Sequence, residues 1–198
     1  MSNQCLKENP ETHPPPELQE FDVMVALSKI KKTATGPDGL PFWVWRDNCT
    51  TLAPVVTALW NKSLSSYTRP TAWKEANINP LPYVDTPVQY SDFRAIKMTP
   101  VIARCFERTV YYHYSKKVFE ENLTVKQYAY KEGCSCKDAL IQIQYNYLKA
   151  LDHKDCNYVR LFAMDFSKAF DNVKHSLVGE KLKALHLNTY LVNWFLSF

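Results

Sequence analysis

The sequence has 198 residues, of which 46% are hydrophobic and 14% aromatic, enough for one domain with an apolar core and too many for a disordered tail. The 24 Lys and Arg and 20 Asp and Glu residues give a net charge of +4, which suits a nucleic-acid partner without requiring one. No apolar run approaches the ~18 residues of a membrane span, and the first 20 residues are polar and proline-rich, so neither a membrane nor a secreted protein is expected.

The six cysteines have no second Cys or His pair at zinc spacing. We therefore expect reduced thiols without disulfide partners, in an intracellular protein of the cytoplasm and/or nucleus. Residues 1–19 contain four prolines among Asn, Gln and Glu, and this composition predicts a disordered linker.

The first predicted helix begins near residue 20. Its apolar side chains keep helical spacing at Val23, Ala26, Leu27 and Ile30. The helix ends in a basic cluster that includes Lys29, Lys31 and Lys32, and the following TATGPDGLP predicts a tight turn.

A second helix is predicted over residues 52–64. The side chains expected to face the core are Leu52, Val55, Val56, Leu59, Trp60, Ser63 and Leu64. Residues 75–81 then alternate like a strand, and Pro80 and Pro82 confine that strand to an edge.

A third helix is predicted from Thr99 and Pro100, a cap and a first-turn proline, to about Asn122. It exposes Arg104 and Arg108, which would either follow a phosphate backbone or belong to an ordinary solvated face.

A short strand is expected at 127–133. Ser135 and Asp138 form a capping box for a helix that ends near Leu151, and the apolar face of this helix is expected to pack under a sheet.

Leu161 to Met164 form a short apolar run that predicts a strand buried on both faces. The run ends at Asp165, whose charge needs a cation, an Arg or Lys partner, or backbone N–H groups. The alternative is a strand end followed by a helix capped by Asp171 or Asn172.

Two more helical segments follow. One is predicted over 177–185, with Asn188 as its left-handed stop. The last apolar segment has no partner in the sequence, so we expect Trp194, Phe195 and Phe198 to be exposed.

The string DFSKAFDNVKH at 165–175 resembles the first catalytic palm motif of reverse transcriptases from non-LTR (LINE-like) retrotransposons. Four further blocks resemble that family in the same order: 31–41, 73–82, 93–108 and 127–140. The resemblance implies an α+β, helix-rich fingers and partial palm of a right-hand polymerase, with an incomplete antiparallel palm sheet. The fingers would span 20–155 and the truncated first part of the palm 156–198.

The resemblance also implies roles for particular residues. Asp165 would be the first catalytic carboxylate and, with the Phe166 carbonyl, a ligand of the two Mg²⁺ ions used in nucleotidyl transfer. Residues implied to bind the nucleotide are Arg94, Lys97, Lys131 and Phe170. Residues expected to contact nucleic acid are Lys31, Lys32, Arg104 and Arg108. The partners would be an RNA template, a DNA primer and deoxynucleoside triphosphates.

Three positions qualify these roles. Ala95 stands where the family usually has a proline, and Tyr83 stands where a lysine is common. A missing triphosphate contact would weaken nucleotide binding, although Lys97 could substitute for it. Phe170 would exclude a 2′-hydroxyl from the sugar site, the alternative being a core ring.

The family draws its remaining carboxylates from an Asp-Asp hairpin, and the 198 residues contain no Asp-Asp pair. We therefore expect a fragment of an RNA-directed DNA polymerase that is inactive as given. The alternatives are a non-catalytic nucleic-acid-binding module, which would bind RNA in a salt-dependent way, and a protein-interaction scaffold, which would not.

Overall fold

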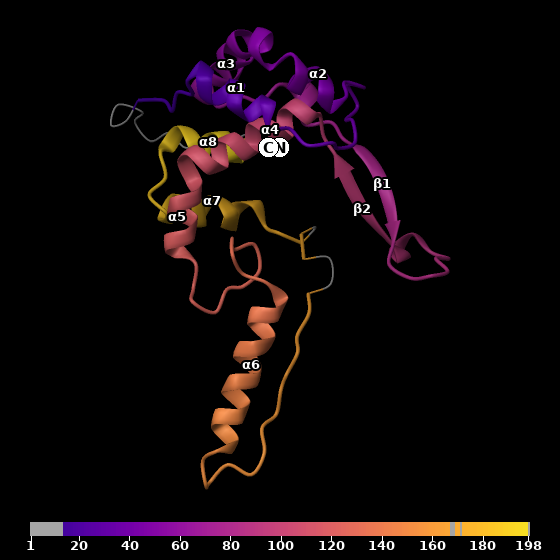
Figure 1. The fold of residues 1–198 in the computed structure, drawn as a ribbon, viewed down its shortest axis with the longest axis vertical. Coiled ribbons are helices and arrows are strands. Elements are labelled where there is room, and N and C mark those ends of the chain that lie inside the picture. The colour runs from indigo at the N-terminus through magenta and orange to yellow at the C-terminus, as the bar shows by residue number, and fades with distance from the viewer. Residues whose placement is uncertain (1–13, 167–168, 171, 198) are drawn as a thin grey trace.

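The structure is a computed structural model that describes residues 14–166, 169–170 and 172–197. A helical body carries two projections, a β-hairpin and a long helix (Figure 1). The body contains α1 (Glu20–Ser28), α2 (Phe42–Asp47), α3 (Cys49–Ser65), η2 (Thr71–Trp73), α4 (Val101–Val110), η4 (Tyr111–Ser115), α5 (Lys116–Asn122), α7 (His175–Ala184) and α8 (Thr189–Leu196).

Aromatic rings from separate helices form the centre of the body. The ring of Trp60 on α3 stacks on Phe106 of α4 with centroids 4.7 Å apart. Trp194 and Trp73 approach the same phenyl ring edge-on, at 5.0 Å and 5.8 Å. Offset-stacked and edge-to-face pairs are the favoured geometries of such rings, so Phe106 lies at the centre of a well-packed cluster.

The predicted helix at 52–64 is confirmed as α3, which buries one narrow stripe of side chains. Two residues expected in that stripe are exposed, Val55 at 69% and Leu59 at 43%. These two side chains lie off the face of α3 that contacts α1 and α8. A helix that is covered on one side buries only some of its apolar side chains.

The predicted helix from Pro100 to Asn122 is confirmed as a continuous run of α4, η4 and α5. Pro100 itself is the N-cap, one position later than the Thr99 cap that we predicted. η4 is a π-helical turn, a wider turn that shifts the direction of the side chains after Val110.

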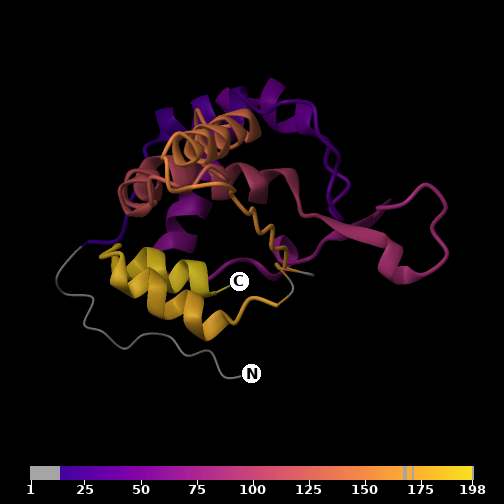
Figure 2. The same ribbon diagram turned by 90° about the horizontal axis from the view of Figure 1, so that it is seen from below.

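The hairpin consists of β1 (Asn77–Pro82) and β2 (Phe93–Met98), joined through η3 (Tyr90–Asp92). The strands are antiparallel, with Asn77 opposite Met98 and Pro82 opposite Phe93. The predicted edge strand is thereby confirmed, and the hairpin extends away from the body (Figure 2).

This hairpin is the only sheet within the described residues, so the chain is of the mixed helix and strand class. The strand expected at 127–133 is wrong, because that segment forms turns. The palm strand expected at 161–164 is also wrong: Leu161 is 72%, Phe162 80% and Met164 90% exposed. A strand buried on both faces needs neighbouring strands, and the described ranges supply none here.

The long projecting helix is α6 (Cys136–Leu151). Its predicted capping box is confirmed, since the Ser135 hydroxyl accepts from the backbone N–H of Asp138 and the Asp138 carboxylate accepts from the Ser135 N–H at 2.7 Å. The predicted packing of α6 under a sheet is wrong, because the helix buries none of its residues. Residues 157–166 return along it without regular structure (Figure 1).

The end of the described chain is better packed than its sequence suggests. Trp194 is fully buried and Phe195 packs against the core, so the expected exposure of these two rings is wrong. Phe198 lies outside the described residues. Asn188 is not a left-handed stop: it caps α8 by accepting from the Tyr190 N–H at 2.9 Å. The left-handed residue is His186, with φ of 53°.

Among the helices described, none has the length and apolar character needed to cross a membrane.

Candidate nucleic-acid interface

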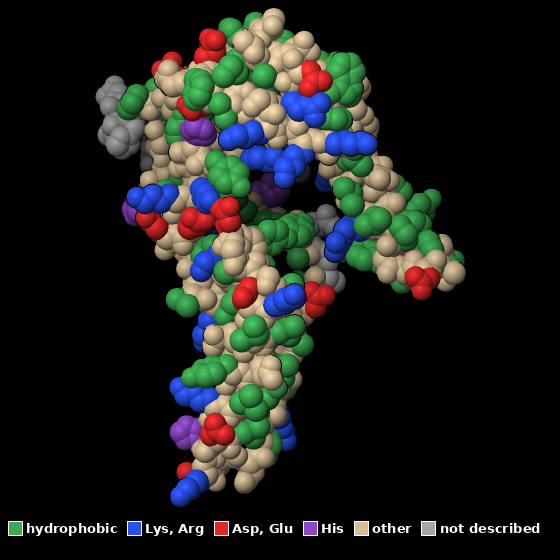
Figure 3. Space-filling model, viewed as in Figure 1, with side chains coloured by type: hydrophobic (Ala, Val, Ile, Leu, Met, Phe, Trp, Pro, Cys, Tyr) green, Lys and Arg blue, Asp and Glu red, His purple; other side chains and the backbone are tan. Residues whose placement is uncertain are grey.

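A groove of about 640 Å³ lies between α1 and α4, and we call it the α1–α4 groove. Its lining residues include three lysines from the end of α1 and the residues that follow: Lys29, Lys31 and Lys32. Arg104 and Arg108 reach it from α4, one helical turn apart. Lys and Arg side chains gather on this face of the body (Figure 3).

The guanidinium of Arg104 is engaged within the protein. Nη1 donates to the Thr33 hydroxyl at 2.9 Å, and Nη2 donates to the Ala34 carbonyl. These bonds hold the loop after α1 against α4. Arg104 thus positions the loop, a role different from the direct phosphate contact that we expected of it.

The GPDG turn contributes to the same arrangement. A Cβ atom at Gly36 would lie 2.5 Å from the Pro100 nitrogen, so only glycine permits the loop to approach the start of α4 this closely. Gly39 has φ of +67°, the left-handed conformation that glycine adopts without strain. The turn therefore fixes where the lysines before it stand relative to α4.

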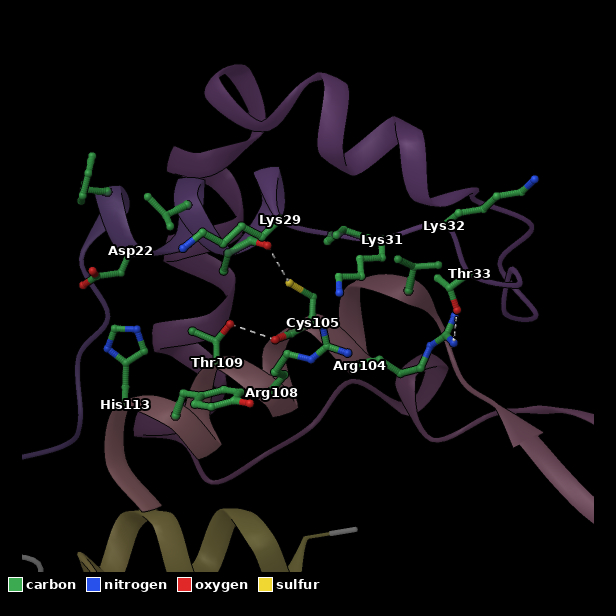
Figure 4. Close-up of a pocket in the computed structure, with 16 residues that line it drawn as sticks. Asp22, Lys29, Lys31, Lys32, Thr33, Arg104, Cys105, Arg108, Thr109 and His113 are labelled. Carbon is green, nitrogen blue, oxygen red and sulfur yellow. Dashed lines mark hydrogen bonds between the residues drawn. The ribbon is translucent and has the colours of Figure 1, made fainter. Parts of the chain in front are cut away.

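The side chains of the remaining cations point in different directions. Figure 4 shows Lys31 and Arg108 pointing into the space between the two helices, while Lys32 points away from it. Lys29 leans across the opening toward Asp22 and His113. Within the described ranges none of these three lysines, nor Arg108, forms an ion pair.

The charge of the groove is therefore strongly positive. Asp22 is the only carboxylate among its lining residues, against five cations. Cations that lack protein partners keep their full capacity for a ligand, and an anion at Lys31 and Arg108 would replace water on both. The sequence predicted that Lys31, Lys32 and the two arginines contact nucleic acid. It did not indicate that the Lys32 side chain points away from the groove.

Three other lining residues were not assigned a role from the sequence: Lys29, Phe21 and Tyr112. Helical spacing in the sequence could have indicated that two of them share a face with other lining residues. Phe21 lies four residues before Val25 on α1, and Tyr112 lies four residues after Arg108 along α4 and η4. Phe21 is 68% and Tyr112 53% exposed.

Cys105 forms part of the groove floor and is a packing residue. Burial raises the pKa of its thiol to about 11, so the reactive thiolate is scarce at neutral pH. The Sγ atom lies 3.6 Å from the Ala26 carbonyl, to which it donates. Cys105 is therefore a poor nucleophile in this structure.

A second group of expected site residues lies at the hairpin. Arg94 Nε donates to the Tyr83 hydroxyl at 3.1 Å, and its guanidinium carbon lies 5.0 Å from the Tyr83 ring centroid. The hydrogen bond to Tyr83 raises the pKa of Arg94, and the nearby Tyr130 raises it further. Tyr83 therefore holds Arg94 in place.

Tyr130 contacts Phe170, which lies in the segment between α6 and α7. Its ring meets Phe170 edge-on, with centroids 6.3 Å apart. Phe170 is 79% exposed, so the alternative that it is a core residue is wrong. Among the expected nucleotide-binding residues, Arg94 contacts Tyr83 and Phe170 contacts Tyr130.

The other two expected nucleotide-binding residues, Lys97 and Lys131, do not take part in these contacts. Side chains alternate along a strand, so Lys97 lies on the face of β2 opposite to Arg94. Lys131 follows Tyr130 directly and is half-buried.

Asp165 and Phe166 lie in the exposed segment after α6, and Asp171 falls outside the described residues. In the part of the chain that the structure describes, no group of three or more His, Cys, Asp or Glu side chains could hold a metal ion. Asp165 and Phe166 offer a single carboxylate, which does not by itself match a two-ion Mg²⁺ centre.

Neither the models of known protein families nor the curated proteins gave a match to this chain.

Proposed function

We propose that the chain is the fingers and first palm segment of an RNA-directed DNA polymerase of the non-LTR retrotransposon type, and that these residues bind nucleic acid. The observation that carries the proposal is the convergence of Lys31 and Arg108, from two separate elements, on one groove. The five sequence blocks in family order support it. The setting would be intracellular, in the cytoplasm and/or nucleus.

The chemistry of the groove suits a phosphate backbone. A polymerase must hold its RNA template and DNA primer in any sequence, so it needs contacts to phosphates more than to base edges. Lys29 and Lys31 offer mobile ammonium groups, while Arg108 offers a planar fork for two phosphate oxygens. No acid pairs with these side chains within the described ranges, so the binding of a phosphate need not break an existing ion pair.

The second group would serve the incoming deoxynucleoside triphosphate. Arg94 is exposed and is held by Tyr83, and the Phe170 ring meets Tyr130 edge-on. Arg94 would then bind phosphate and Phe170 would lie beneath the sugar. Asp165 is the candidate first carboxylate for Mg²⁺, and we assign no catalytic step to these 198 residues because they lack an Asp-Asp pair.

The binding of a labelled single-stranded RNA, followed by fluorescence anisotropy, tests the proposal. We expect salt-dependent binding that Lys31→Glu weakens. Lys117→Glu is the matched control, since the Lys117 side chain is 89% exposed on α5 and outside the groove. The absence of binding at low salt, or equal affinity of wild type and Lys31→Glu, would refute the proposal.

One observation favours a second candidate function, a protein-interaction scaffold. A pocket of about 500 Å³ lies between α6 and the returning chain. Its lining is largely apolar: Ile143, Asn146, Tyr147, Leu151, Val159 and Leu161. A scaffold of this kind would bind a protein through α6 and would show no salt-dependent affinity for RNA.

A further inference from the structure

The β-hairpin projects from the body as a sheet of two strands (Figure 1). Its apolar side chains are open to solvent, among them Ile78, which is 64% exposed, Leu81 at 51% and Ile96 at 39%. A two-stranded hairpin is marginally stable by itself, and further strands or a covering element are needed to bury such side chains. The hairpin therefore has the properties of a sheet that another strand can extend.

The register of the hairpin determines which backbone groups point to its outer edges. The Tyr83 N–H donates to the Asp92 carbonyl at 2.7 Å, in line with the register of the two strands. Directly opposed residues alternate between bonded and unbonded pairs along an antiparallel ladder, so Leu81 and Arg94 form the next bonded pair. The residues between the bonded pairs direct their N–H and C=O groups outward. These residues are Ile78, Pro80 and Pro82 on β1, and Phe93, Ala95 and Lys97 on β2.

The two outer edges differ in the hydrogen bonds that they can form. Proline has no N–H, so Pro80 and Pro82 remove most of the donors that β1 would present to a neighbouring strand. On β2 the N–H of Phe93 closes the turn of η3. No bond within the described residues engages the N–H of Ala95 or that of Lys97, and both residues are exposed. The edge of β2 is therefore able to pair with another strand, and the edge of β1 is protected.

We propose that two copies of this chain associate through the free edge of β2, as antiparallel strands related by a two-fold axis at Ala95. In this register Lys97 lies opposite Phe93 of the second copy. The N–H groups of Ala95 and Lys97 in each copy donate to the Ala95 and Phe93 carbonyls of the other. The result is one continuous antiparallel sheet with the strand order β1-β2-β2-β1. Edge pairing leaves both faces of β2 uncovered, so the inference goes beyond the proposed function and does not depend on it.

The side chains of β2 suit pairing with an identical strand. Its charged residues, Arg94 and Lys97, are both cations, and like charges directly opposite each other destabilise a sheet. The two-fold axis at Ala95 avoids this, because it places Arg94 opposite Ile96 of the second copy. It also places the Lys97 ammonium group beside the Phe93 ring of the second copy, a favourable neighbour for a cation.

The protected edge of β1 explains why the association stops at two copies. In the combined sheet both outer edges are β1 strands, and their prolines leave few donors for a further strand. A two-fold contact between identical edges uses the free edge of each copy and closes the assembly. The proposed partner is therefore a second copy of this chain in a closed dimer.

Sedimentation velocity of the whole chain without nucleic acid tests the proposal. The mass of wild type should rise from that of the 23.0 kDa monomer toward that of a dimer as the concentration reaches the millimolar range, because so small an interface is weak. Ala95→Pro removes the donor at the axis from both copies. It should weaken dimerisation by roughly 5- to 150-fold, the range expected when two hydrogen bonds are lost. The hairpin should stay folded, since Pro80 and Pro82 occupy equivalent outward positions on β1.

Two control variants and a second measurement make the result specific. Ala95→Ser keeps the N–H group and should retain wild-type dimerisation. Ile78→Pro makes the matched change on the outer edge of β1 and should leave dimerisation unchanged. Hydrogen exchange resolved by residue should slow at Ala95 and Lys97 as the concentration of wild type rises, and should not change at Ile78.

Three results would overturn the proposal. Wild type that stays monomeric at every concentration would show that the β2 edge does not pair with a second copy. A dimer that Ala95→Pro leaves intact would place the contact on another surface. Growth of the assembly beyond a dimer would contradict the protection of the β1 edge. A chain that dimerises through β2 but binds no RNA would refute the proposed function alone.

Discussion

The guanidinium carbon of Arg69 lies 4.0 Å from the centroid of the Trp194 indole, which joins the segment after α3 to α8. Arg69 is 3% exposed, and its Nη1 donates to Glu107 Oε1 at 3.0 Å. The Trp194 Nε1–H in turn donates to the Ser63 hydroxyl at 3.1 Å. The last described helix is therefore part of the same core as α3 and α4.

The first prediction concerns this anchoring of α8. Trp194→Ala should lower the free energy of unfolding by about 3–5 kcal/mol, because it empties a buried site against Phe106 and leaves Ser63 without its donor. Phe166→Ala is the control, since that ring is 82% exposed, and should change stability by no more than about 0.5 kcal/mol. Urea unfolding measures both, and equal effects would contradict the packing described.

The second prediction follows from Glu107. Burial raises the pKa of its carboxyl above the ordinary 4.5, and the neighbouring Arg69 opposes that shift. Because the folded-state pKa is the higher one, the stability that Glu107 contributes is fully present below pH 4.5 and is lost as the pH rises through the folded-state pKa. The stability of wild type relative to Glu107→Gln should therefore fall as the pH rises above 4.5.

Asp138 provides a control for which the pH dependence of stability should have the opposite sign. Its carboxylate accepts from the Ser135 hydroxyl at 2.6 Å, and this bond, with one from the Ser135 backbone, lowers its pKa below the ordinary 3.8. Its stabilising contribution is present above that value and lost as the pH falls. The stability of wild type relative to Asp138→Asn should rise with pH, and the same slope for both variants would contradict these assignments.

The third prediction concerns the dynamics of α6. This helix buries none of its residues, so the amide protons of α6 should exchange faster than those of α3, which is packed in the core. Ser135→Ala removes the N-cap and should accelerate exchange in α6 alone, consistent with the loss of about 1 kcal/mol of helix stability. Exchange in α6 as slow as in α3 would show that the helix is covered.

Elements with local signals were predicted well. The helical spacing from Leu52 to Leu64 identified α3, and the Ser135–Asp138 pair identified the start of α6, because caps and spacing act within a few residues. Pro80 and Pro82 correctly restricted β1 to an edge strand, since proline cannot donate to a second neighbour.

The burial of side chains was predicted less well, because it depends on which other elements of the fold pack against them. The run from Leu161 to Met164 has the composition of a buried strand but has no strand beside it in the described ranges. Trp194 had no partner in its own segment and found Phe106 far away in the sequence. Likewise, the cations Lys31 and Arg104 were identifiable by type, while the anchoring of Arg104 to Thr33 arises only from the tertiary fold.

The fourth prediction concerns catalysis. The 198 residues as given should show no primer extension on an RNA template with Mg²⁺, since they offer Asp165 but no Asp-Asp pair. A mock preparation sets the background. Extension above that background which Asp165→Ala abolishes would mean that the chain holds a complete catalytic site.

The measurement that tests nucleic-acid binding by the α1–α4 groove most directly is the salt dependence of RNA affinity for wild type and Arg108→Gln. Each phosphate contact releases counterions, so the logarithm of the binding constant should fall linearly with the logarithm of salt concentration. Arg108→Gln should reduce that slope by about 1, and Lys117→Gln on α5 should not. A slope near zero for wild type, or an identical slope for Arg108→Gln, would contradict the account.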